Sequence, residues 1–168
     1  MSLSFATEMN KTDLLARIIE RLGTDLDIAQ RSAQTAYEAA TAKENIAENK
    51  YDTLGLEASY LATGQARRME EIRQARAAYQ QLQMRDYDPE AGIQVSNLVL
   101  LVDEHDQQQR LFLGPEAAGL KLGEGETLVT VITPRSPLGQ SLMGKFEGDE
   151  VVMVLGNVRH VYEIVQAR

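Results

Sequence analysis

The chain has 168 residues, of which 43% are hydrophobic and 25% are charged, and its net charge at pH 7 is −8. Because it contains no cysteine, disulfides and thiolate metal sites are excluded, and a reducing compartment is expected. The acidic balance argues against stable binding to free DNA, which requires a basic surface that neutralises phosphates.

Residues 1–11 show no hydrophobic repeat and are expected to form a flexible leader. The sequence shows no signal-peptide pattern at its start and no apolar run approaching the ~18 residues of a membrane span. We therefore expect a cytoplasmic protein that does not bind membranes.

A first long helix is predicted over residues 12–40. Asn10 or Thr12 can cap its start, because either side chain can accept hydrogen bonds from the N–H groups of the first turn. Apolar residues then recur in steps of three and four, which is typical of a coiled-coil seam. This seam consists of Leu15, Ile18, Leu22, Leu26, Ala29, Ala33, Ala36 and Ala40.

A second helix is predicted over residues 44–86. No proline occurs between Met1 and Asp88. Neither helix could bury its apolar stripe alone, so the two are expected to fold back on each other. Residues 12–86 would then form an antiparallel coiled-coil hairpin whose tip lies near residues 41–48.

The predicted tip is acidic. Glu44, Glu48 and Asp52 are spaced i, i+4 and i+8, so they would share one face if the second helix began near Lys43. One interpretation is a solvated helix N-terminus that the helix dipole favours. The other is a site in which the carboxylates reach a partner.

The hydrophobic repeat changes at Pro89, within a linker predicted at residues 87–91. A short helix is expected after Ser136, which can act as its cap, with Pro137 in the first helical position. Strands are predicted at 95–102, 110–113, 128–132, 151–155 and 158–165. The sequence therefore predicts an α+β protein, with a small antiparallel β domain and one short helix at 92–168.

Two segments resemble the Gre family of bacterial transcript-cleavage factors. Residues 133–151 read Thr-Pro-Arg-Ser-Pro-Leu-Gly-Gln-Ser-Leu-Met-Gly-Lys-Phe-Glu-Gly-Asp-Glu-Val, similar to the C-terminal domain of that family. Residues 48–51, Glu-Asn-Lys-Tyr, resemble the Glu-Asn-x-x-Tyr sequence of the family's coiled-coil tip with one residue fewer. In a second register, Lys-Glu-Asn at 43–45 fits the same motif without a gap there. The resemblance implies an FKBP-like fold for residues 92–168.

The resemblance also implies a function. In this family the C-terminal domain docks on RNA polymerase beside its secondary channel, and the coiled coil enters the channel. Acidic residues at the tip help to hold a second Mg²⁺ in the polymerase active site, and this ion promotes cleavage of backtracked RNA. The nascent RNA would thus be an indirect partner of the protein. Two metal ions suit an in-line displacement, since they stabilise both the attacking and the leaving oxygen.

On this resemblance Glu44 and Glu48 would be the catalytic and Mg²⁺-binding residues, acting only within RNA polymerase. The free protein would be a monomer that binds no cofactor and has no independent enzyme activity. The implied polymerase-binding residues are Ser136, Pro137, Leu138, Gly144, Lys145, Gly148 and Asp149.

The tip departs from the family pattern, in which an Asp precedes the Glu by three residues. The corresponding residue is Asn45 if Glu48 is the matched glutamate, and Thr41 if Glu44 is. An amide or hydroxyl binds Mg²⁺ more weakly than a carboxylate does. Two functions therefore remain open: a cleavage factor that uses both glutamates together, and a non-cleaving regulator that occupies the channel.

A prolyl isomerase is a third hypothesis, suggested by the FKBP-like fold. That chemistry requires an apolar pocket lined by aromatic side chains. Residues 92–168 offer only Phe112, Phe146 and Tyr162 for it.

Overall fold

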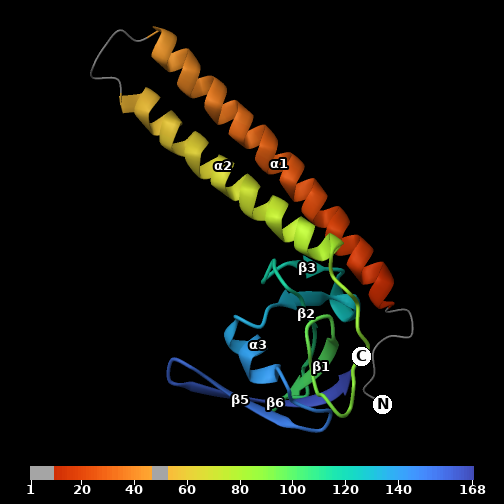
Figure 1. The fold of residues 1–168 in the computed structure, drawn as a ribbon. Coiled ribbons are helices and arrows are strands. Elements are labelled where there is room, and N and C mark those ends of the chain that lie inside the picture. Colours follow the sequence, from red (N-terminus) through yellow and green to blue (C-terminus); the bar gives the residue numbers. More distant parts are fainter. Residues whose placement is uncertain (1–9, 47–52) are drawn as a thin grey trace. The chain divides into compact units, whose positions relative to one another are not determined.

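The structure is a computed structural model that describes residues 10–46 and 53–168, with side chains described at 10–42 and 62–168 (Figure 1). It divides into two compact units, one made of Ile19–Ala77 and the other of Met1–Ile18 together with Ala78–Arg168. The elements in chain order are α1 (Lys11–Ile46), α2 (Thr53–Gln80), β1 (Leu98–Asp103), β2 (Gln108–Leu113), β3 (Lys121–Leu122), the 3-10 helix η1 (Gly125–Thr127), β4 (Val129–Ile132), α3 (Pro137–Leu142), β5 (Glu150–Leu155) and β6 (Val158–Ala167). The predicted α+β class is confirmed.

Helix α1 begins at the predicted cap. The Asn10 Oδ1 atom accepts hydrogen bonds from the backbone N–H of Thr12 at 2.7 Å and of Asp13 at 3.4 Å. The helix then continues to Ile46, so the prediction that it ends at 40 was wrong. The physical reason is that no glycine or proline occurs from 24 to 54, and nothing else breaks the helix at the predicted turn.

The apolar seam of α1 agrees largely with the sequence prediction. Leu14 is buried in place of Leu15, which is only half-buried. None of the helices among the described residues is long and apolar enough to span a membrane. The buried residues that belong to the predicted seam are Ile18, Leu22, Ala29, Ala36 and Ala40.

Helix α2 ends at Gln80, six residues before its predicted end. The backbone of Arg85 is instead held by two buried side chains. Ser96 Oγ accepts a hydrogen bond from the Arg85 N–H at 2.8 Å, and Asn97 Nδ2 donates to the Arg85 carbonyl at 3.1 Å. These side-chain bonds replace the helical hydrogen bonds that the prediction assumed.

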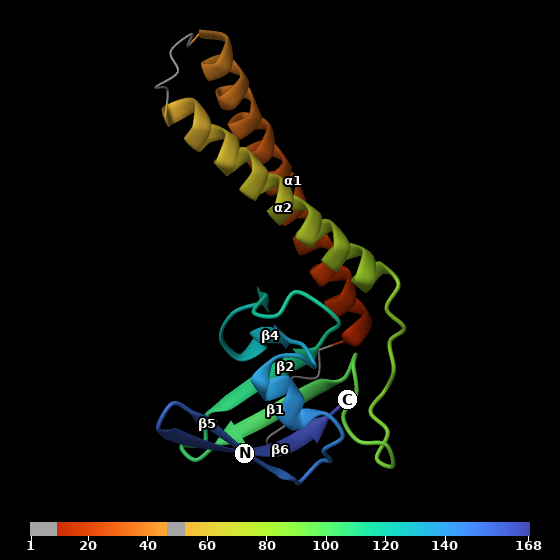
Figure 2. The same ribbon diagram turned by 60° about the vertical axis from the view of Figure 1, so that its left-hand side comes forward.

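Within the unit formed by 19–77, α1 and α2 lie side by side and antiparallel (Figures 1 and 2). A Cβ atom built on Gly23 would lie 3.5 Å from Cζ of Arg76, so these two residues face each other. This pairing agrees with the extension of α1 to Ile46.

The six strands form one sheet in the order β3-β4-β2-β1-β6-β5. The predicted strands are all present, and the hairpin between β5 and β6 turns at Gly156, whose φ of 64° favours glycine. The sheet is mixed, so the prediction of a purely antiparallel sheet was wrong: β2 and β4 are parallel, Arg110 to Leu113 lying against Val129 to Ile132. Residues 114–128 cross over between these strands and return the chain in the same direction.

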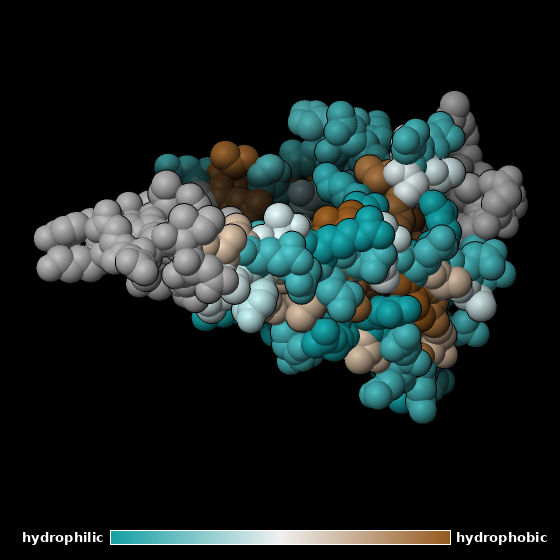
Figure 3. All heavy atoms as spheres, turned by 90° about the horizontal axis from the view of Figure 1, so that it is seen from above, coloured by the Kyte–Doolittle hydropathy of each residue, from teal (hydrophilic) through white to brown (hydrophobic). Residues whose placement is uncertain are grey.

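One hydrophobic cluster lies between α3 and the sheet. A second contact joins α2 to the sheet, where the ring of Tyr79 lies 6.5 Å from that of Phe112. Hydrophilic residues cover most of the described surface in Figure 3. The cluster consists of Ile93, Val99, Leu101, Leu111, Leu113, Ile132, Leu142, Val151, Ile164 and Ala167.

Candidate docking surface and acidic helix end

The start of helix α3 is fixed by its Ser136 cap and by the close packing of Gly139 against a backbone carbonyl. Ser136 Oγ accepts a hydrogen bond from the Gly139 N–H at 3.2 Å and donates to the Thr133 carbonyl at 2.7 Å, with Pro137 in the first turn. A Cβ atom on Gly139 would lie 1.8 Å from the same carbonyl oxygen, so only glycine fits there. The Ser-Pro-Leu-Gly sequence is therefore explained by local geometry.

The α3 turn, defined here as residues 143–149, returns the chain to the sheet. Gly144 has a φ of 77°, and its N–H donates to the carbonyl of Ile93 at 2.9 Å. Gly148 has a φ of 90° and donates to the carbonyl of Ile164 at 2.7 Å. Asp149 Oδ2 accepts a hydrogen bond from the Phe146 N–H at 2.9 Å. Both glycines and the aspartate shape the backbone of this turn.

The seven residues assigned to polymerase binding are thus brought together, but most of them serve the fold. Leu138 packs against the hydrophobic cluster, and only Pro137 and Lys145 combine an exposed position with a side chain that could meet a partner. Two exposed apolar side chains lie beside Lys145: Met143 and Phe146 are each 38% exposed. Of the two, sequence reasoning missed Phe146, because a turn has no periodicity that marks which side chains face outward.

Met143 also borders a hollow of about 500 Å³. Both apolar and polar side chains line it, and Arg85 is the charged residue among them. The α3 turn and this hollow together form a surface that could accept an apolar side chain of a partner. The other lining residues are Leu82, Gln83, Gln94 and Val95.

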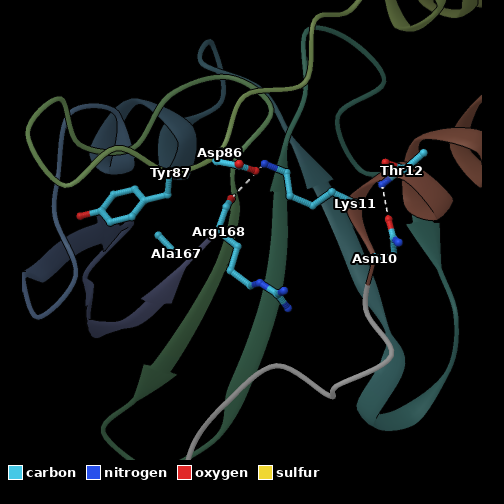
Figure 4. Close-up of a pocket in the computed structure, with 7 residues that line it drawn as sticks. All are labelled: Asn10, Lys11, Thr12, Asp86, Tyr87, Ala167 and Arg168. Carbon is cyan, nitrogen blue, oxygen red and sulfur yellow. Dashed lines mark hydrogen bonds between the residues drawn. The ribbon is translucent and has the colours of Figure 1, made fainter.

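A second pocket, of about 570 Å³, lies at the start of α1 (Figure 4). Lys11 Nζ donates to the backbone carbonyl of Arg85 at 2.6 Å and to that of Arg168 at 3.2 Å. Burial lowers the pKa of the Lys11 ammonium, and the charge of Asp86 opposes this effect. The lysine is therefore engaged in joining three chain segments, which is a structural role.

The acidic residues of the predicted tip are only partly within the described structure. Glu44 lies in the last turn of α1, whereas Glu48 and Asp52 lie outside the described residues. The expectation that Glu44 opens the second helix was wrong, since α1 runs on to Ile46. Within 10–46 and 53–168, no group of three or more acidic or histidine residues could hold a metal ion.

Comparison with known proteins gives several similar solved structures, three of which are described here. No family model matches the chain, and no curated protein does. The structure of GreA factor homolog 1 (Gfh1) of Thermus thermophilus is 18% identical, covers 89% of this chain and 94% of its own, and has a TM-score of 0.37. A structure of the transcription factor Gfh1 is 19% identical, with coverages of 89% and 92% and a TM-score of 0.38. Gfh1 of Thermus aquaticus is 19% identical, with coverages of 88% and 92% and a TM-score of 0.37.

The three aromatic residues that an isomerase pocket would need do not contact one another in the described part of the chain. Phe112 is fully buried against Tyr79, and the ring of Tyr162 stacks on His160 at 6.3 Å. Phe146 is exposed in the α3 turn. The three rings therefore lie in different surroundings within the described part of the chain.

Proposed function

We propose that the protein is a transcription elongation factor that binds bacterial RNA polymerase. The observation that carries this proposal is the combination of a long helical pair with a sheet unit bearing the Gre-like segment 133–151. Helix α1 has 36 residues and α2 has 28, with paired apolar faces. At ~1.5 Å per residue, α1 is roughly 54 Å long, a length suited to reaching into a channel.

The α3 turn is the proposed docking surface. Met143 and Phe146 supply exposed apolar area, and Lys145 between them supplies a positive charge. Burial of large apolar side chains at the centre of an interface contributes most of the affinity in typical complexes. The backbone bonds of Gly144 and Asp149 hold this turn in one conformation, which lowers the entropy cost of binding.

The proposed role of the acidic helix end is to supply Mg²⁺ ligands to the polymerase. Carboxylate oxygens of Glu44 and Glu48 would bind one ion, and water and polymerase groups would complete its octahedral coordination. The ion would stabilise the attacking and leaving oxygens as the RNA phosphodiester is cut. The protein alone would bind the ion poorly, because two carboxylates cannot complete six-fold coordination.

A transcript-cleavage assay on a stalled, backtracked complex tests this function. The double variant Glu44→Gln/Glu48→Gln should lose cleavage while binding polymerase nearly as the parent does, because amides keep the shape but not the charge. Glu38→Gln, a matched change on the same helix, should behave as the parent. If the double variant cleaves as well as the parent, the glutamates have no catalytic role. If the parent does not bind polymerase, the whole proposal is wrong.

A non-cleaving regulator of the same channel is the second candidate. It is favoured by the absence of the family Asp, whose place is taken by Asn45 or Thr41. In that case the parent would bind polymerase and change elongation or pausing without stimulating cleavage.

A further inference from the structure

Strand β5 forms one edge of the sheet and pairs only with β6 among the described strands. The hairpin of these two strands projects from the rest of the sheet in Figure 1. Edge strands usually carry lysine, proline or a bulge that prevents pairing with another chain. Glu150 is the only charged residue of β5, and the strand contains neither lysine nor proline.

The outward backbone groups of β5 follow from its hydrogen bonds to β6. Ile164 donates to the carbonyl of Asp149 at 2.9 Å, and hydrogen bonding to the partner strand alternates from there. Residues 151, 153 and 155 therefore direct their N–H and C=O groups to β6. Glu150, Val152 and Val154 direct theirs outward, away from the sheet. Val152 is 45% exposed and Val154 is 66% exposed, so apolar side chains accompany these backbone groups.

We propose that β5 pairs antiparallel with β5 of a second copy of the chain, with Val152 opposite Val152 at the two-fold axis. The outward groups of Val152 then meet their equivalents, and those of Glu150 meet those of Val154 in the second copy. Val152 lies opposite Val161 in the hairpin. A row of four valines, two from each copy, therefore lies side by side on one face at the centre of the pairing.

Charge complementarity supports this register. Glu150 lies directly opposite Glu163 of β6, a like-charge pair that destabilises the hairpin. Arg159 lies opposite Val154. In the proposed pairing, Val154 of the second copy lies opposite Glu150. Since Arg159 lies opposite Val154 within each copy, Arg159 of the second copy falls in the same cross-strand row as Glu150 and Glu163. The second copy thus supplies the cation that this row lacks among the described ion pairs.

A disulfide test exploits the absence of cysteine from the chain. Val152→Cys should form a covalent dimer when oxidised with glutathione, because the two Cα atoms at the axis lie about 5.5 Å apart in a hydrogen-bonded pair. Val158→Cys is the matched control, since Val158 is 56% exposed but lies on β6. Equal cross-linking at the two positions would overturn the proposal.

Sedimentation equilibrium of the full chain provides the second test. Such a small interface is expected to give a weak dimer that dissociates on dilution. Val152→Lys should abolish the dimer, and Arg159→Glu should weaken it. Combining Arg159→Glu with Glu150→Arg should restore it, while circular dichroism confirms that each variant is folded.

A parent chain that stays monomeric up to its solubility limit would overturn the self-pairing. If that monomer also loses affinity for RNA polymerase on Val152→Lys, the edge accepts a polymerase segment instead of a second copy. A dimer that survives Val152→Lys would equally overturn the proposal, because it would use another surface.

Discussion

Tyr79 is the residue that joins the end of α2 to the sheet. It is fully buried, and its hydroxyl donates to the carbonyl of Glu116 at 2.7 Å. Tyr79→Phe should lower the free energy of unfolding by about 1–2 kcal/mol, because the buried carbonyl is left without its donor. Urea unfolding at neutral pH measures this change. An unchanged midpoint would mean that water replaces the hydroxyl.

The same residue predicts a dependence of stability on alkaline pH. Burial raises the pKa of the Tyr79 phenol above its usual value of 10.0, and the Glu116 carboxylate adds to the effect. Its contribution to stability is complete below pH 10.0 and is lost as the pH rises further, because the unfolded chain releases the proton first. Tyr79→Phe should therefore lose less stability than the parent above that pH. Lys11, whose pKa burial lowers, has the opposite effect but is present in both proteins.

At the scale of residues, the sequence predicted the helix N-caps better than it predicted which side chains are buried or exposed. Asn10 and Ser136 were both identified as possible caps, because a side-chain acceptor just before an apolar repeat is typical of a helix N-cap. Ser96 was not singled out: it is buried with a φ of 81°, and its hydroxyl bonds a backbone eleven residues away. Phe146 was assigned no docking role for a related reason, since tertiary packing decides which turn residues face outward.

At the scale of elements, two glycines in helices should respond oppositely to substitution. A Cβ atom on Gly64 of α2 meets nothing within 4 Å, so Gly64→Ala should stabilise the protein by about 0.5–1 kcal/mol through helix propensity. Gly139→Ala of α3 places its Cβ against the Thr133 carbonyl and should destabilise by about 1–3 kcal/mol. Thermal unfolding of both variants tests the pair. A destabilised Gly64→Ala would contradict the open surface found there.

The proposed docking surface on the α3 turn leads to a prediction about affinity for RNA polymerase. Phe146→Ser should weaken binding to RNA polymerase about tenfold, or ~1.4 kcal/mol, because it removes exposed apolar area without altering the backbone bonds of the turn. Val158→Ser, another exposed apolar residue on the hairpin of β5 and β6, is the control and should bind as the parent does. Affinity is measured by titration of labelled polymerase. Equal losses in the two variants would mean that general surface hydrophobicity, not this turn, drives binding.

Most elements were predicted from their hydrophobic repeats, but two features of their arrangement were not. The two-residue strand β3 has no repeat to detect, and its pairing with β4 depends on a crossover of residues 114–128. The second helix was expected to begin near Lys43, which would have aligned the acidic row on one face. The charged residues there do not end a helix, and α1 runs on to Ile46.

At the scale of the whole molecule, the tip provides a test of both candidate functions, because it lacks the aspartate of the Gre pattern that it resembles. If Glu48 is the matched glutamate, Asn45→Asp should raise transcript cleavage; if Glu44 is, Thr41→Asp should do so. A third carboxylate would hold Mg²⁺ more firmly than an amide or hydroxyl does. The cleavage rate of a backtracked complex is the measurement, with binding followed in parallel. No gain from either variant, in a protein that binds polymerase, favours the non-cleaving regulator.

The division of the chain has a consequence for how such proteins can diversify. The unit that contains the sheet consists of two separate segments, Met1–Ile18 and Ala78–Arg168, so Ile19–Ala77 is an insertion within it. A cut at the predicted linker would separate Tyr79 from Glu116 and Lys11 from Arg168. Recombination that exchanges the 19–77 unit between related genes would instead need two junctions, near residues 18 and 78. Lineages could then vary the length of the inserted hairpin by whole heptads while keeping the sheet unit unchanged.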